Sequence, residues 1–315
     1  MPGKTPSVAL VVLNWNNWQD TIECLESLRR LSYSCHRILV VDNGSTDDSE
    51  QILRQRFPEL EILQAGANRG YAGGNNVGLR RALELEVDYV CLLNNDVVVE
   101  RDFLTPLVAA MESDRHLGVA GGLQCSFDES HVIQNSGTYF NRYTSLVRTD
   151  SAGEVDHGQC DQRKEVDFIC GCALLARVEM VRSLGLLDES FFLLGEEAEW
   201  CLRAQRAGWR VCYIPGSKIY HKGAATLGSQ PALCTYYSLR NRLWLMRRFS
   251  SPAQYALFLL LFFFYLCPKM ILGRLVKGEA QLLKPLLRAL RDGFAPMHPT
   301  IPVGSGAAQS LPARE

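Results

Sequence analysis

Short apolar runs of strand length, separated by helical segments, constrain the fold of this chain more than any other feature. The runs are Ser7–Leu13, His36–Asp42, Tyr89–Leu93 and Val119–Leu123, with a shorter one at Glu61–Gln64. Continuous apolar runs of this length are typical of strands that are buried on both faces of a parallel sheet. The sequence therefore predicts an α/β fold with a doubly wound, mostly parallel sheet and helices on both faces.

The segments between these runs carry the spacing of amphipathic helices. Ser45, with Asp48 three residues later, is expected to cap a helix that Pro58 ends. The polar stretch 124–164 is expected to form an irregular excursion with edge strands, a candidate acceptor-side loop, before the chain returns to the sheet at Val166–Leu175. Further helices are expected at 20–30, 75–85, 103–111 and 196–207, and a last strand at 211–214.

The charge balance and the cysteines limit the classes of partner and compartment. The 33 basic and 34 acidic residues nearly cancel, so no overall basic field favours nucleic acid as a partner. The 11 cysteines form no CxxC pair and no cluster with zinc-binding spacing, and many free thiols fit a reducing compartment. The apolar run Val8–Leu13 is too short for the core of a signal peptide, so we expect the catalytic part to stay in the cytoplasm.

The C-terminal region differs in character from the rest. Tyr255–Cys267 holds thirteen residues without a charge, which is shorter than the ~20 apolar residues of a membrane span. By length alone a buried core helix is an equal alternative, but aromatic residues in the run and basic residues on both sides favour a membrane-embedded or interfacial helix. Leu282–Leu290 then resembles a basic amphipathic helix on anionic lipid. We expect a catalytic domain at 1–235, a helical membrane-associated region at 236–293 and a disordered tail at 294–315.

Polar clusters follow the predicted strands at their carboxyl ends, where ligands bind in open α/β sheets. One such cluster could be turn chemistry, but clusters at successive strand ends indicate a nucleotide pocket. Asp42 could accept a hydrogen bond from a pyrimidine or ribose, although DNGS is also a common turn sequence. Glycines near residue 70 let a ligand approach the backbone and open a helix whose N-terminus favours phosphate. The candidate binding residues are Asn14, Asp42, Asn43, Asn68, Gly70, Gly73, Asn75, Asn94 and Asn95.

Acidic residues and one histidine are candidates for metal binding and proton transfer. Asp96 ends an apolar strand, where a carboxylate can hold Mg²⁺ or Mn²⁺ against a diphosphate, and a turn is the alternative. His221 is a candidate metal ligand, although a lone histidine is more often structural. Glu196, Glu197 and Glu199 crowd one helix start, a position that the helix dipole favours. One of these carboxylates, aimed into a cleft, could also deprotonate a hydroxyl.

Several motifs together resemble family 2 glycosyltransferases of the GT-A fold, especially the bacterial rhamnosyltransferase-like branch. They run in family order over roughly residues 7–227. Their combination is specific, although no single motif is. The matching stretches are VVLNWNN, ILVVDNGSTDDS, NRGYAGGNNVGL, YVCLLNNDVVVE, DFICGCALLARVEM, LGLLDESFFLLGEEAEWCLRAQRAGWR and IYHKGAAT.

The resemblance implies where the donor binds. Asp42 and the strand end near Asn14 would hold the nucleoside, and Gly171 and Cys172 would line the pocket of the donor sugar. The implied donor is a nucleoside diphosphate sugar, with dTDP-rhamnose as the first choice and a UDP-sugar as the next. The implied acceptor is a hydroxyl of a saccharide or of a lipid-linked acceptor.

The resemblance also implies a metal site and a base. Asp96 matches the last acid of the family's DxD metal motif, and His221 matches a histidine that can complete the metal site. Glu197, next to Glu196, matches the second acid of the motif that supplies the catalytic base. The chain departs from the family twice. Its metal motif reads NND and lacks the first acid, and its base motif reads EE instead of ED.

These expectations describe an inverting glycosyltransferase of cell-surface polysaccharide synthesis. It would act at the cytoplasmic face of the inner membrane, either peripherally or with one short embedded helix. Two alternatives stay open. One is a noncatalytic scaffold on the same fold that binds a nucleotide sugar or a lipid. The other is an NAD-type oxidoreductase, which the absence of a GxGxxG motif disfavours.

Overall fold

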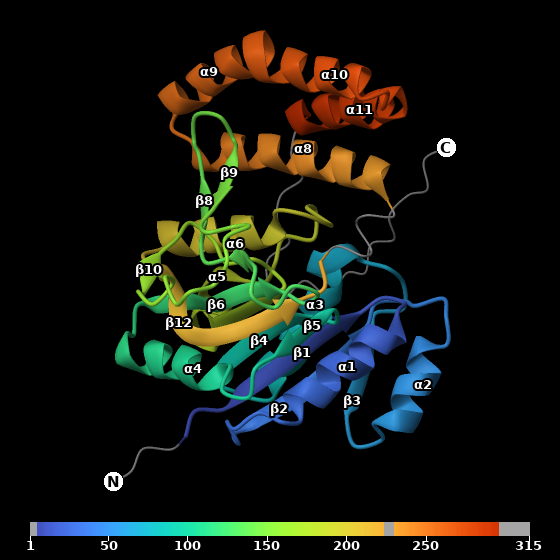
Figure 1. Cartoon of the computed structure of the whole chain (residues 1–315), viewed down its shortest axis with the longest axis vertical. Helices are drawn as coiled ribbons and strands as arrows, with labels where there is room; N and C mark the ends of the chain where they lie inside the picture. Colours follow the sequence, from blue (N-terminus) through green and yellow to red (C-terminus); the bar gives the residue numbers. More distant parts are fainter. Residues whose placement is uncertain (1–4, 224–229, 296–315) are drawn as a thin grey trace.

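A ten-stranded mixed sheet forms the centre of the computed structural model, which describes residues 5–223 and 230–295 (Figure 1). The strand order is β10-β12-β6-β11-β4-β1-β2-β3, with β5 paired to β12 and β7 paired to β6. Strand β7 is Ile133–Asn135 and strand β10 is Lys164–Glu165. The principal strands are β1 (Val8–Asn14), β2 (His36–Asp42), β3 (Glu61–Gln64), β4 (Tyr89–Asn94), β5 (Val97–Val99), β6 (Leu117–Ser126), β11 (Ala173–Arg177) and β12 (Arg210–His221).

Helices cover both faces of the sheet, as the sequence predicts. Alternate residues of β1 explain this, because Val8 and Leu10 belong to one apolar cluster whereas Ala9 and Val11 belong to the other. The first cluster includes residues of α1 (Trp18–Leu28), α2 (Ser49–Arg56) and α4 (Leu104–Ser113). The second includes residues of α3 (Gly70–Glu84), α5 (Val178–Leu184) and α6 (Glu196–Arg206).

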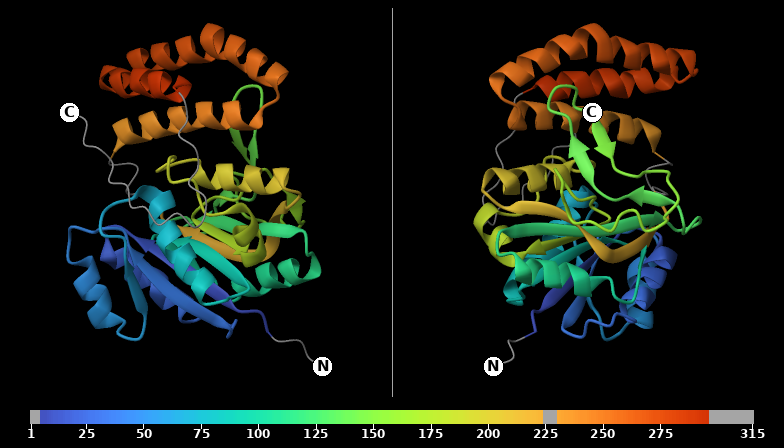
Figure 2. Two further views of the ribbon diagram at one scale, coloured as in Figure 1. Left: turned by 180° about the vertical axis from the view of Figure 1, so that it is seen from behind. Right: turned by 60° about the vertical axis from the view of Figure 1, so that its left-hand side comes forward.

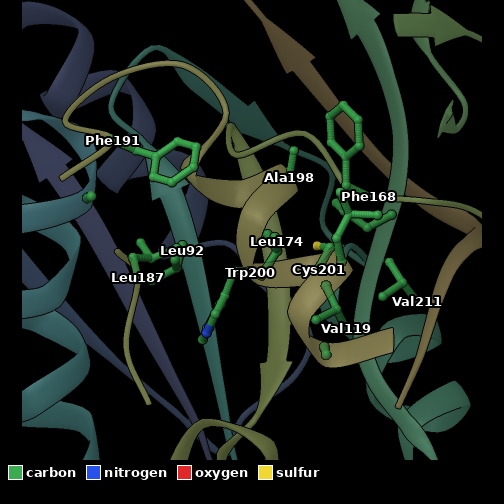
Figure 3. Close-up of a cluster of buried hydrophobic side chains, with 14 of the residues drawn as sticks. Leu92, Val119, Phe168, Leu174, Leu187, Phe191, Ala198, Trp200, Cys201 and Val211 are labelled. Carbon is green, nitrogen blue, oxygen red and sulfur yellow. The ribbon is translucent and has the colours of Figure 1, made fainter. Parts of the chain in front are cut away.

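The core beneath α6 fixes the position of that helix on the sheet (Figure 3). The Trp200 side chain is fully buried, and its indole N–H donates to the carbonyl of Gly185 at 3.0 Å. Leu92, Val119 and Leu174 of the sheet lie in the same cluster. Burying a large apolar side chain contributes about 1.5–3 kcal/mol, so the N-terminus of α6 is held firmly at one place on the sheet.

The strands combine parallel and antiparallel pairings. Strands β1, β2, β3 and β4 pair in parallel, which places their carboxyl ends at one edge. Strand β11 runs antiparallel between β4 and β6. The long β12 is parallel to β6 but antiparallel to β5, so the chain segment after β4 meets the end of β12.

The excursion between 124 and 164 forms short strands, as the sequence predicts. They are β7 (Ile133–Asn135), β8 (Thr138–Phe140), β9 (Val147–Thr149) and β10 (Lys164–Glu165). Strands β8 and β9 pair as a separate hairpin that rises toward α8 (Pro231–Phe249) in Figure 1. Its turn is fixed there, because the Arg242 guanidinium donates to the carbonyl of Ser145 at 3.1 Å and to its hydroxyl at 3.0 Å.

Two helix starts differ from the sequence-based expectation. Helix α3 begins at Gly70 instead of Asn75, so the glycines expected in a loop form its first turns. Helix α2 begins at Ser49 without a side-chain cap, and the Ser45 hydroxyl donates to Asp42 instead. Ser45 belongs to the DNGS turn instead of capping the helix, because its nearer hydrogen-bond partner is the Asp42 carboxylate three residues earlier.

The C-terminal helices form a layer at one end of the molecule, with α8 between this layer and the sheet (Figure 2). The layer contains α9 (Pro252–Leu261), a π-helical turn (Phe262–Leu266), α10 (Cys267–Val276), a 3₁₀ turn (Ala280–Leu282) and α11 (Leu283–Phe294). The domain boundary expected at residue 235 falls inside α8. Most of the disordered tail expected at 294–315 lies outside the described residues, which end at 295.

Helices α9 and α10, with the π turn, form one apolar helix. Pro252–Val276 comprises 25 residues, its most apolar window has a mean hydropathy of 2.1, and only 17% of that window is buried. It is long and apolar enough to cross a membrane by length and composition. The sequence predicts that the apolar face of α11 contacts lipid, but in the structure this face packs inside the protein. Leu286 and Ala289 are buried, and Gly293 packs against Leu243 of α8.

Candidate functional site

The strand ends of the parallel core bring the predicted polar residues to one edge. Asn14 pairs with Asp42 across β1 and β2, and Leu13 pairs with Asn94 across β1 and β4. The backbone N–H of Asn94 donates to the carbonyl of Cys172 at 3.0 Å, which places the segment before β11 at this edge too. The edge therefore unites candidates that are up to 158 residues apart in the sequence (Asn14 and Cys172).

Asp42 is 2% exposed and holds a turn together. Its Oδ1 accepts from the Asn14 amide at 2.9 Å and from the Ser45 hydroxyl at 2.5 Å, and its Oδ2 accepts from the Ser45 N–H at 3.2 Å. The Asn14 Oδ1 accepts from Thr21 at 2.6 Å. These bonds confirm the turn interpretation of Asp42, and its contact with a nucleoside stays a prediction.

The predicted asparagines after β2 and β3 stabilise one another. The Asn43 side chain donates to the Asn68 side chain at 3.2 Å and to the carbonyl of Gly70 at 3.1 Å, and it accepts from the N–H of Arg69 at 3.0 Å. Asn75 donates to the carbonyl of Tyr71 at 3.0 Å, while its buried Oδ1 has no partner among the residues that the structure describes.

Close packing explains the glycines at the start of α3. Gly70 has a φ of 69°, and a Cβ there would lie 2.2 Å from the carbonyl oxygen of Phe192. A Cβ on Gly73 would lie 2.5 Å from the Cβ of Arg69. The N–H of Tyr71 donates to the carbonyl of Phe192 at 2.7 Å, so the loop before α6 occupies part of this helix N-terminus. Phosphate binding here stays a prediction.

Asp96 and His221 lie side by side. His221 pairs with Val97 in the antiparallel β5–β12 ladder, and its Nε2 lies 3.3 Å from Oδ1 of Asp96. Burial lowers the pKa of His221, but the adjacent Asp96 carboxylate outweighs this effect and leaves the pKa raised. Asp96 Oδ1 is buried and makes no hydrogen bond with good geometry to any described residue.

These two side chains fit part of a divalent cation site. An oxygen of Asp96 without a hydrogen bond and an imidazole nitrogen facing the same point are suitable ligands. At the other ring nitrogen of His221, Gln124 Nε2 lies at 2.9 Å and Gln134 Oε1 at 3.2 Å, which orients the ring. Within residues 5–223 and 230–295 no group of three His, Cys, Asp or Glu could hold a metal alone, so a bound cation would need ligands from the substrate or water.

Asn94 and Asn95 occupy the positions before Asp96. The N–H of Asn94 is bonded to Cys172, as described above, and the Asn95 side chain donates to the Thr21 hydroxyl at 3.0 Å. The amide of Asn95 thus ties the metal-motif loop to α1. A direct contact of either asparagine with a donor stays a prediction.

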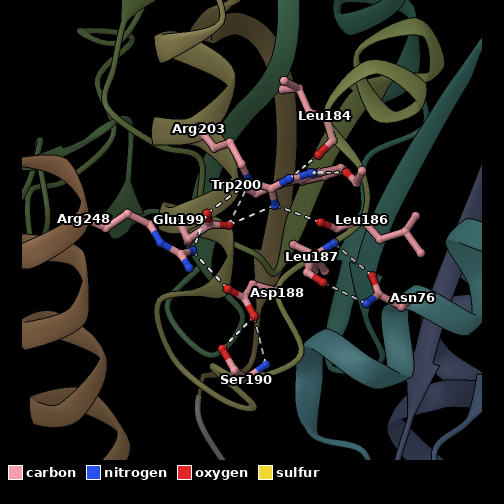
Figure 4. Close-up of polar contacts among 11 residues, drawn as sticks. Asn76, Leu184, Leu186, Leu187, Asp188, Ser190, Glu199, Trp200, Arg203 and Arg248 are labelled. Carbon is pink, nitrogen blue, oxygen red and sulfur yellow. Dashed lines mark hydrogen bonds and ion pairs between the residues drawn. The ribbon is translucent and has the colours of Figure 1, made fainter. Parts of the chain in front are cut away.

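The three acids at the start of α6 have different surroundings. Glu199 is fully buried and forms ion pairs with Arg203 at 2.9 Å and with Arg248 at 2.8 Å, so it is structural (Figure 4). Glu196 is buried, and its Oε2 has no partner among the described residues. Burial and the charge of Glu197 hold the pKa of Glu196 well above its usual range.

Glu197 is partly exposed, unlike its two acidic neighbours. Its Oε2 accepts from the backbone N–H of Gly195 at 3.1 Å. Burial raises the pKa of Glu197, although backbone hydrogen bonds oppose this shift. A partly exposed carboxylate with a raised pKa has the properties of a general base.

The segment 170–172 connects the acids of α6 with the Asp96–His221 pair. A hydrogen bond from Cys172 lowers the pKa of the Cys170 thiol, and the charges of Glu197 and His221 both act on the same thiol. Asp96 in turn helps to raise the pKa of Cys172. Cys170 and Cys172 also line a small cavity together with Gln124. The structure thus brings the separately predicted acids and histidine to one region.

The sequence reasoning missed Tyr71 and the two glutamines. The Tyr71 hydroxyl donates to the carbonyl of Gly171 at 2.5 Å, and burial together with the charges of Glu197 and Glu196 raises the pKa of Tyr71 far above its usual range. Tyr71 lies within the motif NRGYAGGNNVGL, so the motif could have identified it as a site residue. The sequence offered no signal for Gln124 and Gln134.

Known proteins resemble the chain in sequence and fold. The model of "Glycosyl transferase family 2" matches residues 9–185. The low-salt glycan biosynthesis hexosyltransferase of Haloferax volcanii is 24% identical over 75% of this chain and 74% of its own length. The N-acetylglucosaminyl-diphospho-decaprenol L-rhamnosyltransferase of Mycobacterium tuberculosis is 26% identical over 62% of this chain and 69% of its own.

A solved structure has the same fold. The mannosyltransferase from Pyrobaculum calidifontis, solved with GDP-Man and Mn²⁺, matches with a TM-score of 0.57 and 14% identity over 93% of this chain and 88% of that chain. These matches favour an enzyme over the noncatalytic scaffold and over the oxidoreductase that the sequence left open. Because the family model covers more than half of the sequence, the chain belongs to glycosyl transferase family 2 and is a nucleotide-sugar-dependent glycosyltransferase.

Proposed function

We propose that this glycosyltransferase moves rhamnose, with inversion, from a nucleoside diphosphate donor to a hydroxyl of a saccharide or lipid-linked acceptor in cell-surface polysaccharide synthesis. The observation that carries the proposal is the convergence of Glu197 and the Asp96–His221 pair on the segment 170–172. A base and a diphosphate-binding pair that can act on the same donor sugar are what a single displacement requires.

Glu197 is the better candidate for the base than Glu196. A base must be ionised before it accepts a proton, and the buried Glu196 has a pKa well above its usual range. Glu197 is partly exposed and keeps the Gly195 N–H bond that stabilises its charged form.

The displacement follows from these positions. The acceptor oxygen attacks the anomeric carbon while the bond between that carbon and the diphosphate breaks. The electron pair of the broken bond leaves with the diphosphate, and the hydroxyl proton passes to Glu197. Because attack and departure occur on opposite faces of the sugar, one displacement inverts the anomeric centre and needs no protein nucleophile.

Asp96 and His221 would hold a divalent cation, Mg²⁺ or Mn²⁺. This cation would neutralise the charge on the leaving diphosphate. The open hydrogen-bonding capacity of Asp96 Oδ1 supports this assignment. Asn14, Asp42 and Asn43 at the neighbouring strand ends are proposed to shape the nucleoside site, mostly by fixing its loops.

The donor sugar is proposed from similarity. The mycobacterial relative is named as an L-rhamnosyltransferase, and the motifs of this chain resemble the same branch. We therefore propose dTDP-rhamnose as the donor, with a UDP-sugar as the next choice. The acceptor of that relative, by its name, carries a diphospho-decaprenol group, which supports a lipid-linked acceptor here.

We also propose that Pro252–Val276 lies in the membrane interface at the cytoplasmic face. Phe258 and Phe262 on one side of this helix are fully buried, whereas Phe264 on the other side is 82% exposed. A spanning helix would have to leave the contacts of Phe262 and Phe263 with Phe294 of α11. Exposed basic residues flank the apolar side and suit anionic lipid: Lys269, Lys277, Lys284, Arg288 and Arg291.

The test is a turnover assay with a panel of nucleotide sugars, with and without Mn²⁺. We expect dTDP-rhamnose to be consumed in a cation-dependent reaction, and Glu197→Gln and Asp96→Asn to lose it. Glu50→Gln, which changes a surface carboxylate of α2 in the same way, is the matched control. Near wild-type turnover in both site variants would overturn the assigned roles, and turnover only with another nucleotide sugar would overturn the donor.

A further inference from the structure

The loop that leads into α6 holds an unfavourable backbone conformation. Phe192 has a φ of 63° and Leu194 a φ of 67°, values that bulky L-residues rarely adopt. Gly195 follows with a φ of 105°, and Glu196 begins the helix. Such a conformation persists only where its surroundings fix it.

Asn241 of α8 makes the bonds that fix this loop. Its side-chain amide, which is 1% exposed, lies within hydrogen-bond distance of three loop carbonyls. They are Phe191 at 3.0 Å, Leu193 at 2.8 Å and Leu194 at 2.7 Å. One buried amide thus supplies hydrogen-bond donors to carbonyls of a strained loop that lies outside any helix or strand.

Arg240 completes the contact from the preceding position on α8. Its guanidinium donates to the carbonyls of Ser190 at 2.8 Å and Phe191 at 2.9 Å, and its Nε donates to Asn241 Oδ1 at 2.8 Å. The last bond orients the Asn241 amide so that its N–H groups face the loop. Among the described residues Arg240 forms no ion pair with a carboxylate, so its hydrogen bonds go to these carbonyls and to Asn241.

The loop contacts the candidate base directly and also contacts Tyr71. The N–H of Gly195 donates to Glu197 Oε2, and the carbonyl of Phe192 accepts from the N–H of Tyr71. Tyr71 in turn binds Gly171 of the candidate sugar pocket. If the loop relaxed, Glu197 would lose the Gly195 bond and the fixed position that this bond gives its carboxylate.

We propose that Asn241 is a positioning residue of this enzyme, which sets the Glu197 carboxylate by holding the loop 191–195 through three carbonyls. The inference rests on the proposed function, because it assumes that Glu197 is the base. It also makes α8 part of the catalytic unit, although α8 lies beyond residues 9–185 that the family model matches.

The consequence is a change in pH dependence. The charge of Glu197 acts on Glu196. The other titratable or charged groups that interact with these two acids are Tyr71 of α3, Cys170 of the segment before β11, Cys201 of α6 and, from α8, the cation of Arg240. Loss of the Gly195 bond removes a donor that stabilises the charged form of Glu197. The pKa of Glu197 then rises, so the acid limb of the rate profile moves to higher pH.

The test compares the full-length wild type with Asn241→Ala and with the isosteric Asn241→Asp, which lacks the amide donors. We expect kcat to fall at least tenfold in both, the donor KM to stay within about twofold, and the acid limb to shift to higher pH. Arg247→Gln is the matched control, because Arg247 donates from the same helix to the carbonyl of Ala295 instead of the loop.

Each outcome decides the question. Unchanged kcat and an unchanged acid limb in folded Asn241→Ala overturn the proposal. A loss of kcat with an unchanged acid limb also overturns it, because a purely structural role lowers the folded fraction without moving the limb. If Asn241→Ala does not fold, Asn241→Ser is measured by the same criteria. Activity of Glu197→Gln would instead refute the proposed base, which separates the two failures.

Discussion

His221 Nε2 lies 3.3 Å from Asp96 Oδ1, although 125 residues separate the two in the sequence. The antiparallel pairing of β12 with β5 produces this contact, because His221 stands opposite Val97, the residue after Asp96. The carbonyl of Asp96 also accepts from the N–H of Lys222 at 3.0 Å. The metal-motif loop is therefore held at the end of β12 by a backbone hydrogen bond and by the close approach of these two side chains.

This geometry predicts the cation dependence of two variants. With His221→Ala, one ligand is lost and the Mn²⁺ concentration needed for half-maximal turnover should rise about tenfold or more. Asp96→Asn should remove most of the cation stimulation. A titration of activity against Mn²⁺ measures both effects, with His116→Ala as the control for loss of an imidazole. A half-maximal Mn²⁺ concentration equal to that of the wild type in His221→Ala would exclude this residue as a ligand.

The base should control the acid side of the pH profile. Burial raises the pKa of Glu197, and the base is active only when ionised. The value of kcat should therefore fall as the pH decreases through this raised pKa, and be highest above it. Glu197→Gln should reduce kcat about 10²–10⁴-fold and abolish this limb. A residual limb of the same shape in Glu197→Gln would show that another group titrates.

Glu199 should contribute to stability and not to the chemistry. It is fully buried between Arg203 and Arg248, and removal of one partner leaves buried charge uncompensated. We expect Glu199→Ala to lower the free energy of unfolding by about 3 kcal/mol or more. Urea unfolding measures this, with the exposed Glu50→Ala expected to change it by less than about 0.5 kcal/mol. Equal effects of the two changes would contradict the structural role.

The packing of α3 on β1 should not tolerate a side chain at Gly78. A Cβ there would lie 2.2 Å from Cγ1 of Val11, and the core offers no space for it. Gly78→Ala should destabilise the protein by about 1–3 kcal/mol. Gly273→Ala in α10 meets nothing within 4 Å and should instead stabilise by about 0.5–1 kcal/mol. Thermal unfolding of both variants should show shifts of opposite sign.

Membrane association should depend on the exposed side of Pro252–Val276. Phe263→Ser and Phe264→Ser remove apolar surface that is 51% and 82% exposed, so they should weaken binding to vesicles that contain anionic lipid. Leu146→Ser, which changes an exposed leucine of the β8–β9 hairpin, is the control. Cosedimentation with vesicles measures the bound fraction. Unchanged binding of both phenylalanine variants would reject this surface as the lipid contact.

The sequence by itself determined the sheet and the family. The run His36–Asp42 and the run Glu61–Gln64 became β2 and β3 with those same bounds, because short apolar runs between turn residues favour strands over helices. It also named Asp96, Glu197 and His221, since motif residues keep their order along the chain. Periodicity did not reveal that α3 begins at Gly70, because glycines carry no side chain to mark a helical face.

Only the tertiary structure decided which of these residues meet and which are merely structural. The three acids of α6 look alike in the sequence, but their burial and partners separate the ion-paired Glu199 from the partly exposed Glu197. The contacts of Asn241 with loop 191–195 have no sequence signature, because a hydrogen bond between a side-chain amide and backbone carbonyls imposes no residue type on the loop. Such long-range contacts depend on the packing of α8 against the loop, which no local pattern encodes.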